Sequence, residues 1–132
     1  MSFTSLEDEK IIVKEEGVFS YSFTAYDTIK AGQAVGVKAE GSPYAKVGPT
    51  DSSEDISFVG VAMYDTASGS KLAIAGPGSK VYGRGESGIS AGDPVAASSE
   101  GKFTKADASG AKAGIALEDT TAANEIFKVL IK

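Results

Sequence analysis

The sequence predicts an all-β protein: a β-barrel or β-sandwich with two internally repeated strand–turn–strand units and an extended N-terminal arm. Three observations predict this fold. The 16 glycines are spread along the chain, as expected of many short elements joined by tight turns. Within residues 18–26, the apolar Phe19, Tyr21, Phe23 and Ala25 alternate with Ser20, Ser22 and Thr24, which is the two-residue period of a strand. A pattern of turns and strands in residues 29–75 recurs in residues 89–131.

The length and apolar content of the chain suit one globular domain, since it has 132 residues and 42% of them are hydrophobic. We therefore expect residues 10–132 to form a single β-domain. Apart from Met1, residues 1–9 contain two apolar side chains, Phe3 and Leu6, which are too few for a core of their own. This segment is expected to form an arm, and Phe3 and Leu6 are candidate interface residues that become buried against a neighbouring subunit or a partner.

The repeat can be followed along the sequence. Residues 29–35 (IKAGQAV) match residues 89–95 (ISAGDPV). Residues 59–63 (VGVAM) match residues 113–117 (AGIAL), and an Asp-Thr step follows soon after each of these two segments. Each copy then ends in an apolar strand. The repeat predicts structural glycines, at turns or where two backbones approach closely, and these are Gly32, Gly92, Gly41, Gly101, Gly60 and Gly114.

The charge and composition exclude several partners. A net charge of −5 argues against binding to nucleic acid, which needs clustered basic residues. The apolar runs are only a few residues long, so no membrane-spanning segment is expected. The N-terminus lacks the basic and apolar regions of a secretory signal. The chain has no cysteine, so packing or oligomerisation must stabilise it without disulfides.

The residues of common catalytic sites are missing. The chain has no histidine and no cysteine, and its neighbouring carboxylates are poor acid–base partners in strands. We predict no catalytic, cofactor-binding or metal-binding residue and expect no enzyme; an unrecognised hydrolase would need an acid–base pair that the pattern does not show. The best candidate for a calcium site is residues 51–55, a run of oxygen ligands in an expected loop, but it lacks the EF-hand spacing and its glycine. Arg84, the sole arginine, is a candidate interface residue or a solvated loop residue.

Segments of the duplicated motif are similar in pattern to a known family of proteins. Ile-x-Ala-Gly-x-x-Val occurs at residues 29–35 and 89–95, Gly-Val-Ala-x-x-Asp-Thr-Ala at 60–67, and Gly-Ile-Ala-Leu-Glu-Asp at 114–119 before a terminal strand. Together these segments resemble small capsid decoration (cement) proteins of tailed phages. The resemblance extends from residue 28 to residue 132, and the N-terminal arm and the strand at 18–26 match it least.

The resemblance implies a structural protein that binds the outer surface of an icosahedral viral capsid and stabilises it. The implied partners are the major capsid protein and further copies of the chain itself, with a homotrimer as the expected state. The implied location is the exterior of the virion, after synthesis in the host cytoplasm. The resemblance implies no catalytic residue and no cofactor.

One alternative function stays open. A carbohydrate- or ligand-binding β-module of a tail fibre or cell-surface structure has the same composition, and it would present exposed aromatic side chains. The candidates for such a surface are Tyr44, Tyr64 and Tyr82. Co-sedimentation with capsids, compared with binding to a glycan array, separates the two functions.

Overall fold

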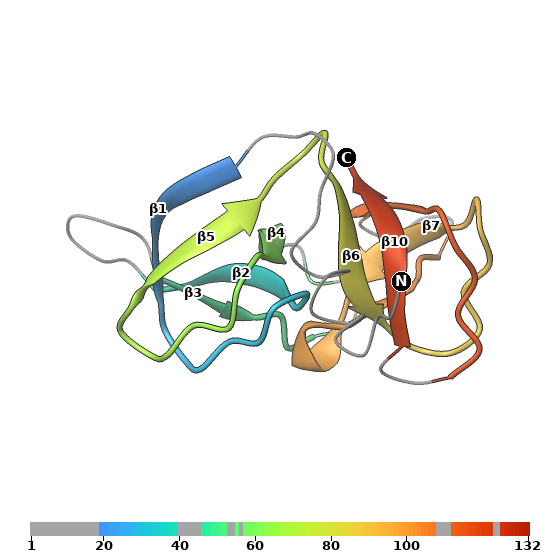
Figure 1. The fold of residues 1–132 in the computed structure, drawn as a ribbon. Coiled ribbons are helices and arrows are strands. Elements are labelled where there is room, and N and C mark those ends of the chain that lie inside the picture. Colours follow the sequence, from blue (N-terminus) through green and yellow to red (C-terminus); the bar gives the residue numbers. More distant parts are fainter. Residues whose placement is uncertain (1–18, 40–45, 53–54, 56, 108–111, 123–124) are drawn as a thin grey trace, which may run out of the picture.

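The computed structural model describes residues 19–39, 46–52, 55, 57–107, 112–122 and 125–132. Within them, ten strands close into two barrels that lie side by side (Figure 1). The first barrel contains β1 (Phe19–Ala25), β2 (Ala34–Ala39), β3 (Lys46–Pro49), β4 (Phe58–Ala62) and β5 (Lys71–Ala75). The second contains β6 (Lys80–Gly85), β7 (Pro94–Ala97), β8 (Phe103–Lys105), β9 (Gly114–Ala116) and β10 (Glu125–Ile131), with the 3₁₀ turn η1 (Ser99–Gly101) between β7 and β8.

The two barrels have the same strand order. In the first it is β1-β3-β2-β4-β5, and β5 pairs back onto β1. In the second it is β6-β8-β7-β9-β10, and β10 pairs back onto β6. Each barrel contains a parallel pair at the same place, β1 with β3 and β6 with β8. Strands β6–β10 therefore repeat β1–β5, and the predicted all-β fold with two repeated units is confirmed as a pair of barrels.

Each barrel also includes a strand, β1 or β6, that precedes the stretches of similar sequence. Both strands pair with the last strand of their own barrel and so close it. No helix in the described part of the chain is long and apolar enough to cross a membrane.

A tight turn connects the first two strands of each barrel, and the same hydrogen bonds hold it. The φ angles of Gly32 and Gly92 are +86° and +92°, in the region that glycine adopts without a steric penalty. Their amides donate to the carbonyl oxygens of Ala62 and Ala116, both at 2.8 Å. The two glycines thus lie in equivalent turns, against the ends of β4 and β9.

An aspartate fixes each of these turns. Asp65 Oδ1 accepts the N–H of Ala31 at 2.8 Å, and Asp119 Oδ1 accepts the N–H of Ala91 at 2.7 Å. Hydrogen bonds to an ionised carboxylate are stronger than those between neutral groups. The aspartate of the repeated Asp-Thr step is therefore part of the turn structure.

Gly60 and Gly114 lie inside strands and not in turns. A Cβ at Gly60 would strike the carbonyl oxygen of Ala75, and a Cβ at Gly114 would strike that of Leu130. Glycine is required at both positions because two backbones approach closely across the β4–β5 and β9–β10 pairs.

Two hydrophobic clusters hold the barrels together. One fills the first barrel and includes Leu72, which is completely buried. The larger one fills the second barrel and also takes in outward-facing side chains of the first. At its centre, Phe103 packs edge-to-face on Phe127 of the second barrel and on Phe58 of the first, with ring centroids 6.0 and 5.9 Å apart. The contact between the barrels is thus continuous with the core of the second barrel.

Candidate interaction surface

Two exposed tyrosines distinguish the first barrel from the second. Tyr26 directly follows β1 and is 49% exposed, and Tyr64 follows β4 and is 46% exposed. When β1 is aligned with β6 and β4 with β9, the same positions in the second barrel hold Glu86 and Glu118. Tyrosine is enriched at protein interfaces because its ring supplies a large rigid contact area with a polar tip. These two side chains make the first barrel the better candidate for a contact surface.

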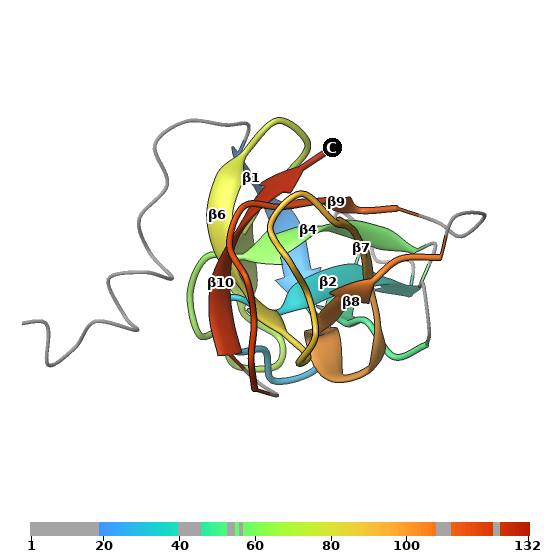
Figure 2. The ribbon, with the colours of Figure 1, turned by 90° about the vertical axis from the view of Figure 1, so that its right-hand side faces the viewer.

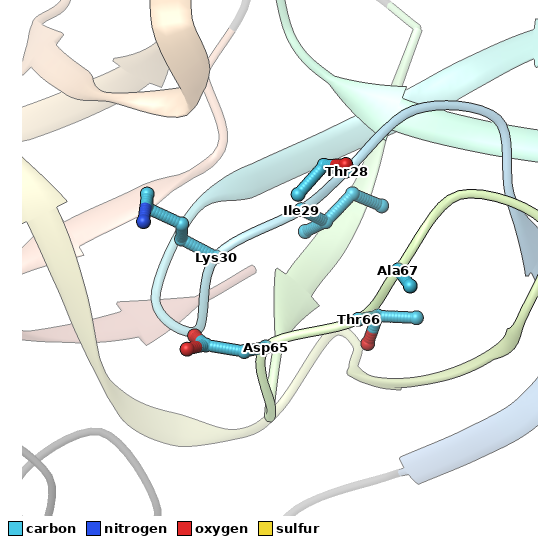
Figure 3. A pocket seen from close by; sticks show the side chains of 6 residues that line it. All are labelled: Thr28, Ile29, Lys30, Asp65, Thr66 and Ala67. Atoms are coloured by element: carbon cyan, nitrogen blue, oxygen red, sulfur yellow. The ribbon is translucent and has the colours of Figure 1, made fainter.

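The segments that carry the two tyrosines enclose a shallow hollow of about 220 Å³ (Figure 3). The residues that line it are Thr28, Ile29, Lys30, Asp65, Thr66 and Ala67. Ile29 and Thr66 each donate their amide to the other's carbonyl oxygen, at 2.9 and 2.8 Å, so a backbone pair forms its floor. Small-molecule pockets usually measure about 300–1,000 Å³. The hollow is better suited to one side chain of a partner protein.

The chemistry of the hollow is limited. Asp65 is engaged with the backbone of the neighbouring turn, and the other ionisable group in the lining is Lys30. Within the described residues, no group of three or more His, Cys, Asp or Glu side chains gathers as metal ligands would. The lining therefore offers contact area and a few hydrogen-bonding groups, and no nucleophile with an activating base.

The acidic loop after β3, the candidate calcium site, is held together by one carboxylate. Asp55 accepts hydrogen bonds from the Ser57 hydroxyl at 2.6 Å, the Ser57 amide at 2.9 Å and the Asp51 amide at 3.1 Å. Burial alone would raise the pKa of the Asp55 carboxyl, but these hydrogen bonds and the Lys38 ammonium lower it below its ordinary value. The Asp55 carboxylate is therefore used in hydrogen bonds to Asp51 and Ser57. Two other residues of the candidate calcium site, Ser53 and Glu54, lie outside the described part of the chain.

Replacing Asp55 with asparagine is expected to lower the free energy of unfolding by about 1–2 kcal/mol at pH 7, because charge-assisted hydrogen bonds are lost. Since folding lowers this pKa, the contribution of Asp55 is complete above the unfolded value of about 3.9 and is lost as the pH falls through the folded value. Urea unfolding at pH 7 and pH 3 measures the difference. Asp51→Asn, which removes the ion pair between the exposed Asp51 carboxylate and Lys38, is the control and should cost under about 0.5 kcal/mol. An Asp55→Asn deficit of equal size at both pH values would contradict this account.

Arg84 lies between the two barrels. Its amide donates to the carbonyl oxygen of Gly32 at 3.0 Å, and its Nε donates to that of Ala31 at 2.9 Å. On another side of the same contact, Gly101 (φ +67°) lies where a Cβ would come 2.7 Å from Gln33 Cβ. Arg84 and Gly101 thus contribute to a contact within the chain, and a role of Arg84 toward another molecule stays a prediction.

Of the other residues predicted from the sequence as surface or turn residues, the structure describes Tyr82 but not four of the rest. Tyr82 is partly exposed, with the Lys128 ammonium 5.6 Å from the centre of its ring. Four of the predicted residues lie outside the described part of the chain: Phe3, Leu6, Gly41 and Tyr44.

Tyr26 is a surface residue that the sequence analysis missed. It directly follows Ala25 and belongs to the segment 18–26 that the sequence assigns to one strand, although it falls where the alternation would place a polar residue. The offset of 60 between Ile29 and Ile89, extended backwards, aligns Tyr26 with Glu86. A tyrosine aligned with a glutamate between two copies of one fold indicates an exposed position, and this signal was present in the sequence.

Comparisons with known proteins give two results. A family model described as phage cement protein matches residues 12–132. The fold is similar to that in the crystal structure of the N base of the head fiber gp8.5 of bacteriophage phi29, with a TM-score of 0.66 and 15% sequence identity over 87% of this chain and 95% of that one. At this identity the likeness concerns the fold alone. No curated protein matches the sequence.

Proposed function

The chain belongs to the phage cement protein family, and we propose that it binds the outer surface of an icosahedral phage capsid and stabilises it. The family match, which spans nearly the whole chain, is the observation that carries this proposal. A decoration protein of this kind contributes by burying surface against the shell, and many weak contacts on one particle add up through avidity.

The proposed partners are the major capsid protein and further copies of the chain, with a trimer as the proposed assembly. The proposed location is the capsid exterior, after synthesis in the host cytoplasm, and the proposed role is structural and not enzymatic. Carboxylates that hold turns and loops, such as Asp65 and Asp55, support a structural reading of the acidic residues. We further propose residues 1–9 as an arm that becomes ordered against a neighbour through Phe3 and Leu6.

The surface of Tyr26, Tyr64 and the hollow between their segments is the proposed contact with the shell. Both side chains are about half exposed, so binding can bury a large additional ring area. The hollow beside them can accept one projecting side chain of the shell protein. Interfaces of this kind usually depend on a few central aromatic residues.

The same tyrosines support one alternative, a carbohydrate- or ligand-binding module of a tail fibre or cell-surface structure. Aromatic rings beside a shallow hollow also suit stacking against a sugar. The likeness to a head fiber base concerns the fold and is compatible with both functions.

The double variant Tyr26→Ser, Tyr64→Ser is expected to bind capsids at least tenfold more weakly, because each ring lost from the centre of an interface costs more than about 1 kcal/mol. Co-sedimentation of the purified chain with empty capsids of the phage that carries its gene measures this, beside a glycan array. Glu86→Gln, at the position equivalent to Tyr26, is the matched control and should bind as the wild type does. If the wild-type chain ignores capsids and binds a glycan, the alternative function replaces the proposed one.

A further inference from the structure

A row of outward-facing side chains on the first barrel is buried against the second barrel. Strand pairing places Ala34 beside Val61, and Val61 beside Ala75, and these side chains are 0%, 2% and 0% exposed. The residues that alternate with them fill the interior of the first barrel. The row itself joins the cluster that fills the second barrel. It therefore belongs to the contact between the barrels.

The second barrel carries the same row on a face that stays partly exposed. Strand pairing places Pro94 beside Ile115, and Ile115 beside Leu130, and each of the three is partly exposed. Leu117, two residues beyond Ile115, is 37% exposed, whereas Met63 at the equivalent position of the first barrel is 4% exposed. We name Pro94, Ile115, Leu117 and Leu130 the free face; Figure 2 views the chain from the side of this barrel.

The charged residue Lys128 borders the free face. Lys128 occupies the position that Ala73 has in the first barrel, since the amides of Leu117 and Met63 donate to the carbonyl oxygens of these two residues. The Lys128 ammonium lies 5.6 Å from the centre of the Tyr82 ring on β6. Its charge is therefore directed toward β6 and away from the apolar row on β7 and β9.

The turns beside the two rows also differ in burial: the turn of the first barrel is buried, and that of the second barrel is exposed. Ala31 and Gly32 are buried, and their carbonyl oxygens accept the two hydrogen bonds from Arg84. The equivalent turn residues of the second barrel, Ala91 and Gly92, are exposed. A two-fold relation between the barrels would dock both turns alike. Because only one turn is docked, the barrels meet head to tail, and this kind of contact leaves an unused face at each end.

The unused position on the first barrel can be identified from the strand pairing. Arg84 pairs with Ile126 on the last strand of the second barrel, and Thr24 pairs with Lys71 on the last strand of the first. Thr24 therefore occupies on β1 the place that Arg84 occupies on β6, and it marks where a turn such as 91–92 would dock.

A second residue supports this position. Val37 pairs with Val47 as Ala97 pairs with Phe103, so Val37 and Ala97 are equivalent. Ala97 is 1% exposed, and its carbonyl oxygen accepts the amide of Asp55 from the first barrel at 2.8 Å. Val37 is 44% exposed. Both unused ends of the chain thus carry an exposed apolar residue whose counterpart is buried in the contact between the barrels.

We propose that the free face docks on the first barrel of a second copy of this chain, with the turn 91–92 against Thr24, so that the contact between the barrels is repeated between chains. This inference rests on the part of the proposed function in which copies associate, and it does not depend on binding to a capsid. A head-to-tail contact that closes makes a ring, and three copies would place six similar barrels around one axis.

Cysteine cross-linking tests the pairing directly, because the chain has no cysteine of its own. Within the chain, the backbone amide of Arg84 donates to the carbonyl oxygen of Gly32, next to Ala31, at 3.0 Å, so the two equivalent backbones approach closely. A disulfide needs Cα atoms about 4.4–6.8 Å apart, and such a backbone contact is compatible with that separation. Mixing Thr24→Cys with Ala91→Cys under mild oxidation should give disulfide-linked dimers of the two variants, and each variant alone should give few. Failure of the mixture to cross-link, or equally efficient linking of Ala91→Cys with itself, would overturn the proposal.

A second measurement uses matched charge substitutions. Leu117→Glu should weaken self-association at least tenfold in sedimentation equilibrium. Ser87→Glu, which adds the same charge at an exposed position outside both the free face and the surface of Tyr26 and Tyr64, should leave it unchanged. A wild-type chain that stays monomeric at high concentration would refute the inference. A Leu117→Glu chain that still associates would also refute it. If this variant keeps its self-association and loses only its attachment to capsids, or only a contact with its own residues 1–18, the free face has another partner and the inference fails. Self-association without capsid binding would leave the inference standing and remove the proposed function.

Discussion

Replacing Phe103 with alanine is expected to lower the free energy of unfolding by about 3–5 kcal/mol, the usual cost of removing a large buried aromatic side chain. Phe103 is completely buried and contacts aromatic rings of both barrels, Phe127 in its own and Phe58 in the other. The cavity would therefore open in the cluster that both barrels share. We expect the two barrels to lose stability together, in a single cooperative transition.

Leu72→Ala is the matched control for this experiment, because Leu72 is equally buried but lies in the cluster confined to the first barrel. It should cost about 2–5 kcal/mol and also give one transition, if residues 10–132 fold as the single domain that the sequence predicts. Calorimetry and urea unfolding measure both variants. Two separated transitions in either variant would show that the barrels unfold independently and would contradict the single-domain prediction.

The repeated turns could be predicted from sequence because their causes are local. A glycine such as Gly32 or Gly92 at positive φ, followed by a strand, is determined by neighbouring residues, and the matching order of segments indicated two similar units. The contact between the barrels could not be predicted in the same way. Met63 and Leu117 are equivalent apolar residues in the repeat, yet one is buried and the other exposed. Only the arrangement of the two barrels decides which of them finds a partner.

The candidate interaction surface could likewise be predicted only in part from the sequence. Tyr64 is predicted from the sequence as a candidate exposed aromatic residue, and its side chain is 46% exposed. Tyr26 is not predicted, because a strand pattern and a surface position are compatible with the same residue. The sequence offers the acidic residues 51–55 as possible oxygen ligands, but it does not show that Asp55 accepts hydrogen bonds from the backbone amides of Asp51 and Ser57, which only the folded loop brings to it. Sequence indicates which groups are available, and the fold decides which of them are already used.

Replacing Gly114 with alanine is expected to destabilise the chain by more than about 3 kcal/mol, although it adds a single methyl group. The new Cβ would strike the carbonyl oxygen of Leu130 and would lie 3.2 Å from the Cα of Ile131. Both obstacles are backbone atoms of the neighbouring strand, so no side chain can move aside. The β9–β10 pair that closes the second barrel must separate to make room, and such overpacking lies at the costly end of single substitutions.

Gly88→Ala separates this steric effect from the general cost of replacing glycine. Gly88 has a φ of +89°, but a Cβ there meets nothing within 4 Å, so only the backbone conformation is penalised, by about 1 kcal/mol. Thermal and urea unfolding of the two variants measure the difference, and near-ultraviolet circular dichroism reports whether Gly114→Ala still folds. We expect Gly60→Ala to resemble Gly114→Ala, because its Cβ would strike the carbonyl oxygen of Ala75 in the first barrel. If Gly114→Ala were as mild as Gly88→Ala, the close approach of β9 and β10 would not be the reason for glycine at this position.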